Sequence, residues 1–75
     1  MDKLDDYSYI WESDKEQFIV VDDEYGKNIF EISGKTLMFV LIEDDDLYNP
    51  IIKKMIKSGN KVYGSIAELE ESIGI

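Results

Sequence analysis

The sequence contains no cysteine, no histidine and no arginine among its 75 residues. Without cysteine no disulfide can form, and without cysteine and histidine the usual ligands of zinc are missing. Nucleophilic catalysis by a cysteine, or by a serine paired with a histidine, is excluded for the same reason. We therefore expect a protein that is not an enzyme, with no catalytic residue, no cofactor and no metal site.

Long apolar runs are missing as well. No stretch approaches the about 20 apolar residues that span a bilayer. The first six residues, three of them aspartates, lack the basic start and the apolar segment of a secretion signal. We expect a cytoplasmic location and no membrane partner.

The apolar residues that are present are enough for one small core. They make up 44% of the chain, which is too much for a disordered segment. At this length we expect one domain over residues 1–75. Such a core yields only about 3–5 kcal/mol of net stability, and small domains often gain more from a disulfide, a metal or a partner subunit. A homodimer is therefore expected.

The charge is strongly one-sided and unevenly distributed. Seventeen acidic residues face eight lysines, for a net charge of −9, so direct contact with nucleic acid is not expected. Residues 1–46 hold 14 acids and 4 lysines, residues 47–64 hold 4 lysines and no acid, and residues 65–75 hold 3 glutamates. The lysines of the middle segment are interpreted as a solvated helix face, or as a surface that binds an acidic patch of a second subunit.

The first half of the chain reads as strands. Residues 7–12 alternate, which predicts a strand over about 7–13 with Tyr7, Tyr9 and Trp11 on one face. That aromatic face is either core or an exposed contact surface. After a polar turn, a β-branched run predicts a strand over about 17–22, paired with the first as a hairpin. Residues 22–28 are expected to be a connection.

Two further strands are expected next. Residues 29–33 predict a third strand and residues 33–35 a tight turn. Residues 36–42 are apolar on both faces, which is typical of a central strand covered on both sides by the domain, or on one side by a second subunit.

The last third reads as helical. Asn49 and Pro50 predict a helix start, and Gly59 a stop, for a helix over about 50–58. A short strand over 61–63 is possible. Ser65 and Glu68 match a capping box before a helix over about 66–73. The expected fold is therefore α+β, with a mainly antiparallel sheet of three to four strands and two short helices.

Two motifs resemble binding sites, one for phosphate and one for a metal ion, but the spacing of their residues does not match either site. Residues 34–36, Gly-Lys-Thr, look like the end of a phosphate-binding loop, but Ile29 stands where that loop needs glycine and a strand follows. We interpret them as a hairpin turn. The run 43–46 follows an apolar strand, where acids often hold Mg²⁺ or Ca²⁺. A calcium loop starting at Asp44 would place Tyr48 at a ligand position and Asn49 where glycine belongs.

The acids in the turns and at strand ends form the candidate partner-binding site. Their negative field attracts cationic surfaces and repels DNA. The predicted partner-binding residues are Asp14, Glu16, Asp22, Asp23, Glu24, Glu43, Asp44, Asp45 and Asp46.

In its size, in these acidic runs and in its lack of arginine, histidine and cysteine, the chain resembles the small acidic DNA-mimic inhibitors encoded by phages, some of which target the histone-like protein HU. The resemblance implies a non-enzymatic inhibitor, active in the host cytoplasm, that covers the nucleic-acid-binding surface of a basic host protein. The alternatives are an immunity or antitoxin protein that blocks a cationic toxin nuclease, and a Mg²⁺- or Ca²⁺-binding protein that uses Asp44, Asp45 and Asp46 with Asp22 or Asp23.

Overall fold

The computed structural model describes residues 3–75 and has the predicted α+β class. A 3₁₀ helix, η1 (Lys3–Tyr7), continues into a short α1 (Ser8–Glu12). Then come the strands β1 (Phe18–Asp23), β2 (Gly26–Ser33) and β3 (Thr36–Phe39), the helix α2 (Asp45–Ser58), the strand β4 (Val62–Tyr63) and the helix α3 (Ile66–Ile73). No helix in residues 3–75 is long and apolar enough to cross a membrane.

The four strands form one mixed sheet in the order β3-β2-β1-β4. The pairs β1–β2 and β2–β3 are antiparallel, whereas β1 and β4 are parallel. The sheet is thus mainly antiparallel, as the sequence predicts. Because β3 and β1 both run opposite to β2, the strands β1, β3 and β4 all point the same way.

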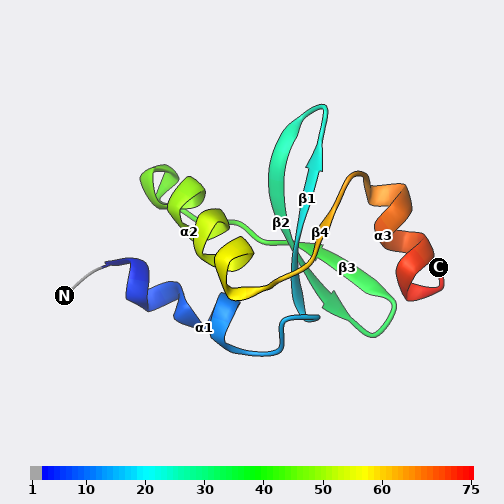
Figure 1. Ribbon diagram of the computed structural model, residues 1–75, viewed down its shortest axis with the longest axis horizontal. Coiled ribbons are helices and arrows are strands. Elements are labelled where there is room, and N and C mark those ends of the chain that lie inside the picture. The colour runs from blue at the N-terminus through cyan, green and yellow to red at the C-terminus, as the bar shows by residue number, and fades with distance from the viewer. Residues whose placement is uncertain (1–2) are drawn as a thin grey trace.

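Helices cover both faces of this sheet (Figure 1). On one face α2, α1 and η1 pack over Phe18, Val20 and Ile29 to form the larger core. On the other face the short α3 packs Leu69 over Ile19 and Val21. Side chains of β1 therefore alternate between two cores, and Phe18 to Val21 are all buried.

The strand predicted over residues 7–13 is wrong, because these residues are helical. The adjacent side chains of Ile10 and Trp11 are both buried in the same core. A strand would send them to opposite faces, whereas a helix places them on one broad face. Leu4 and Tyr7 also pack there, so the apolar residues follow the helical spacing i, i+3, i+7.

The predicted aromatic face of that strand is consequently absent. Trp11 is core and Tyr7 packs against the core, while Tyr9 is 54% exposed. The ring of Tyr9 lies edge-on to Phe18, with centroids 5.9 Å apart. The three residues are not a common contact surface.

The hairpin and the central strand also differ from expectation. The hairpin is β1–β2, so residues 22–28, predicted to be a connection, mostly extend these two strands, and Asp23 pairs with Gly26 across the tip. Residues 36–42 do not form the central strand. Their regular part, β3, ends at Phe39 and lies at the edge of the sheet, because only β2 pairs with it.

Helix α2 begins earlier than the predicted residue 50. Asp44 caps it by accepting a hydrogen bond from the Asp46 backbone N–H at 3.1 Å, and Pro50 lies inside the helix. Leu47 and Tyr48 pack against the larger core. This packing offsets the loss of one helix hydrogen bond at Pro50, which has no backbone N–H to donate. The predicted stop is confirmed: Gly59 has φ +95° and donates its N–H back to Ile56 O.

The predicted helix over 66–73 and the short strand before it are confirmed by α3 and β4. Ser65 Oγ accepts from the Glu68 backbone N–H at 3.1 Å, as a capping residue does. The Glu68 carboxylate, however, accepts from Gly64 N–H at 2.9 Å and not from Ser65. This contact ties the start of α3 to the end of β4.

Candidate functional site

The common direction of β1, β3 and β4 decides where the acidic runs lie. An acid that follows any of these strands comes out at the same end of the sheet, since their carboxyl ends point the same way. In Figure 1 the tip of the β1–β2 hairpin, the start of α2 and the start of α3 all lie in the upper half of the molecule. We call this the acidic end; its carboxylates are Asp22, Asp23, Glu24, Glu43, Asp44, Asp45, Asp46 and Glu68.

The hairpin tip holds the first run in a fixed turn. Asp23 Oδ1 accepts from the Tyr25 backbone N–H at 2.9 Å, which closes the turn. Gly26 follows with φ +105°, a conformation that other residues rarely adopt. Asp22 and Glu24 remain exposed, and Asp22 stands across from Lys27 in the strand register. The tip thus projects two free carboxylates beside one lysine.

The start of α2 holds the second run. Glu43, Asp44, Asp45 and Asp46 line an open depression at the surface. Asp44 is used as the helix cap and lies 3.9 Å from Lys3 Nζ, whereas Asp45 and Asp46 are exposed in the first helical turn. Negative charge at this position is favoured by the helix dipole, so these acids also stabilise α2.

Tyr48 anchors the start of α2 to the sheet. Its hydroxyl accepts from the buried Ile29 backbone N–H at 3.2 Å and donates to Asn28 Oδ1 at 3.2 Å. Burial raises the pKa of the Tyr48 hydroxyl above its usual 10.0, although the hydrogen bond from Ile29 lowers it in part. Asn28 pairs with Val21, next to Asp22. The second acidic run is therefore fastened to the side of the sheet from which the hairpin tip projects.

Glu68 completes the acidic end and was not among the predicted site residues. The sequence marks it as the second residue of a capping box; Ser65 does cap α3, but the Glu68 carboxylate accepts from Gly64 N–H instead. Its place at the same end of the sheet follows from the parallel pairing of β4 with β1. Such pairing between a strand of two residues and a distant one leaves no local signal in the sequence.

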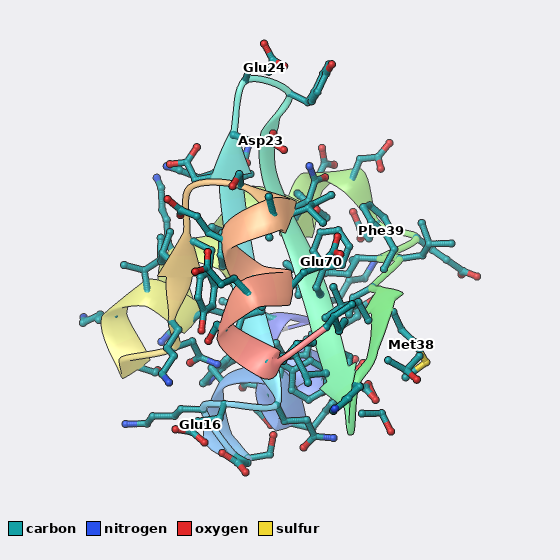
Figure 2. All side chains as sticks on the ribbon, turned by 90° about the vertical axis from the view of Figure 1, so that its right-hand side faces the viewer. Glu16, Asp23, Glu24, Met38, Phe39 and Glu70 are labelled. Carbon is teal, nitrogen blue, oxygen red and sulfur yellow. The ribbon has the colours of Figure 1, made fainter. Side chains whose placement is uncertain are left out.

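The structure separates the two remaining predicted residues from the other seven. Asp14 and Glu16 precede β1 and so lie at the opposite end of the sheet, as Figure 2 shows for Glu16 against Asp23 and Glu24. Asp14 Oδ1 accepts from the Glu16 backbone N–H at 2.9 Å, and Glu16 pairs with Lys61 Nζ at 3.4 Å. This end therefore mixes both signs of charge.

The lysines of α2 occupy a third region. Lys53, Lys54 and Lys57 are exposed and, with Leu4 and Pro50, line a surface hollow of about 370 Å³. They follow the start of α2 by at least two helical turns. The helix thus carries acids at its first turn and lysines toward its last.

Among residues 3–75 no group of three or more His, Cys, Asp or Glu side chains is arranged to hold a metal ion. The alternative in which Asp44, Asp45 and Asp46 bind Mg²⁺ or Ca²⁺ with Asp22 or Asp23 gains no support from their arrangement. No protein-family model, no curated protein and no solved structure matches this chain.

Proposed function

We propose that the protein is a non-enzymatic inhibitor whose acidic end binds the nucleic-acid-binding surface of a basic protein and mimics the charge of DNA there. The observation that supports this function is the gathering of seven of the nine predicted carboxylates at one end of the sheet. A one-sided field of this kind steers cationic partners toward the binding surface.

The arrangement of the acids also suits recognition of a surface built for phosphates. Two separate runs present exposed carboxylates, one from the hydrogen-bonded turn at the hairpin tip and one from the capped start of α2. Binding groups held on rigid elements lose little entropy when a partner docks. Lys3 pairs with Asp44 and Lys27 stands across from Asp22, and within residues 3–75 no other ion pair involves these runs. Most of their negative charge can therefore attract a partner.

Affinity capture tests the proposed class of partner. The immobilised protein should retain basic nucleic-acid-binding proteins from a bacterial lysate at low salt and release them at about 0.5 M salt, because screening weakens exposed charge pairs. The captured protein should also lose bound duplex DNA when the acidic protein is added. Recovery of neutral partners alone, or retention that salt does not change, would contradict the proposal.

A quadruple variant locates the binding surface. Asp22→Asn, Glu24→Gln, Asp45→Asn and Asp46→Asn remove exposed charges and spare Asp23 and Asp44, whose side chains hold a turn and a helix cap. We expect binding to weaken by about tenfold or more.

The matched control removes four acids outside the acidic end, with the changes Asp5→Asn, Glu12→Gln, Glu70→Gln and Glu71→Gln. Both variants lose the same net charge, so a general charge effect would weaken both equally. That result would overturn the assignment of the acidic end as the binding surface.

A further inference from the structure

Strand β3 exposes apolar side chains at a free edge of the sheet. Met38 and Phe39 are 43% and 50% exposed, and Leu41, just beyond the strand, is 82% exposed. Figure 2 shows Met38 and Phe39 at this edge. Edge strands are usually protected from pairing by charged residues or proline. Residues 36–42 contain neither.

The strand register shows which backbone groups face outward. Ile32 donates its N–H to Gln17 O at 2.7 Å, so Ile32 faces β1 and its neighbours in β2 face β3. Their partners in β3 are Met38 and Thr36. Because bonding directions alternate along an antiparallel strand, Leu37 and Phe39 point their N–H and C=O groups away from β2. No strand within residues 3–75 pairs with them there.

We propose that this edge binds a second copy of the chain, β3 against β3 and antiparallel, which joins two four-stranded sheets into one of eight strands. With the twofold axis at Met38, the outward-facing Leu37 of one copy stands opposite Phe39 of the other. The central pairs of this register, Leu37 with Phe39 and Met38 with itself, use residues that are already in strand conformation. A twofold axis makes the contact closed and self-complementary.

Charge also favours a second copy at this edge. Continued beyond the ends of β3, the proposed register places Lys35 of one copy opposite Leu41 of the other and diagonally from its Glu43, within reach of a long side chain. The seven residues between Lys35 and Glu43 are uncharged, so two chains of net charge −9 meet along a segment without like-charge contacts. The other edge strand, β4, has only two residues and follows Lys61.

The dimer has a salt dependence opposite to that of the proposed partner binding. Two chains of net charge −9 repel each other, and added salt screens this repulsion while the apolar contacts at β3 persist. Dimerisation should therefore strengthen with salt, whereas binding of a basic protein should weaken. The paired strands are short, so we expect a weak dimer that dissociates on dilution.

Sedimentation velocity over a concentration series tests the dimer. The wild-type chain should shift from a species of 8.7 kDa to one of twice that mass, and the shift should occur at lower concentration when salt is added. Leu41→Lys places a lysine opposite Lys35 of the second copy and Phe39→Lys places a charge near the centre of the contact. Each should raise the dissociation constant by about tenfold or more.

The control is Val62→Lys on β4, where the replaced side chain is 47% exposed, close to the value for Phe39. It should leave the dimer unchanged. Leu41 is so exposed that its replacement should not affect folding, which circular dichroism would verify. A wild-type chain that stays monomeric at every concentration, or a dimer that Val62→Lys breaks and Leu41→Lys does not, would overturn the proposal. Neither result depends on whether a basic partner binds.

Discussion

Strands β1 and β3 both contain an apolar stretch but differ in burial. From Phe18 to Val21, β1 is at most 5% exposed at any residue, whereas Met38 and Phe39 of β3 are about half exposed. The difference comes from their neighbours. β1 has a strand on each side and helices over both faces, whereas β3 has only β2 beside it. Burial of an apolar strand is thus set by its place in the sheet and not by its own composition.

Truncation of one side chain in each strand should give the largest contrast. Ile19→Ala removes a fully buried side chain and should cost about 2–5 kcal/mol, a loss comparable to the whole stability of a domain this small. Met38→Ala should cost less than about 1 kcal/mol, because nearly half of that side chain is already in water.

Urea unfolding followed by circular dichroism measures both losses, at protein concentrations low enough to keep the chain monomeric. Equal losses for Ile19→Ala and Met38→Ala would mean that β3 is as well covered in solution as β1. The contrast would then disappear.

A smaller loss of stability is expected from Tyr48→Phe, at the point where the pairing of β2 with β3 ends. The Ile29 N–H points toward the β3 side of β2, where it donates a hydrogen bond to the Tyr48 hydroxyl. Tyr48→Phe leaves this buried donor without a partner, which should cost about 1–3 kcal/mol. Tyr25→Phe is the matched control, since Tyr25 is 83% exposed and should change stability by less than about 0.5 kcal/mol. A loss no greater than that of the control would show that another group accepts from Ile29.

Local signals account for the parts of the fold that the sequence predicted. The β-branched run of β1, the glycine after α2 and the serine before α3 each act within a few residues of the element they define. The strand predicted over residues 7–13 rests on the alternation of Tyr7, Tyr9 and Trp11, but Leu4, Tyr7 and Trp11 also have helical spacing. Both periods are present over so short a segment, and packing against α2 selects the helix.

Features that depend on distant contacts were beyond sequence reasoning. Asp44 and Asn49 are both good helix caps, and the packing of Leu47 and Tyr48 on the core decides in favour of Asp44. The apolar residues 36–42 do not reveal how many strands will flank them.

The acids of the candidate site were predicted one by one from their positions in turns and at strand ends. Their grouping could be predicted only if the common direction of β1 and β3 were known. The same holds for the separation of Asp14 and Glu16 from the other acids.

The smallest effect concerns the pH dependence of the Tyr48 contact. Because burial raises the pKa of the Tyr48 hydroxyl above 10.0, the unfolded chain loses this proton first as pH rises. The stability that neutral Tyr48 contributes is therefore full below about pH 10 and is lost as pH rises through the pKa of the folded state. The difference in unfolding midpoint between wild type and Tyr48→Phe should be constant near neutral pH and should narrow above about pH 10.

All other ionisable groups are the same in wild type and Tyr48→Phe, so their contributions cancel in the difference. Tyr25→Phe is the control, because it also removes one tyrosine hydroxyl, from a side chain that is 83% exposed. If the difference between wild type and Tyr48→Phe stayed constant into strong alkali, the hydroxyl would ionise equally in the folded and unfolded chains. That result would overturn the raised pKa of Tyr48 and would mean that the hydrogen bond from Ile29 offsets the effect of burial in full.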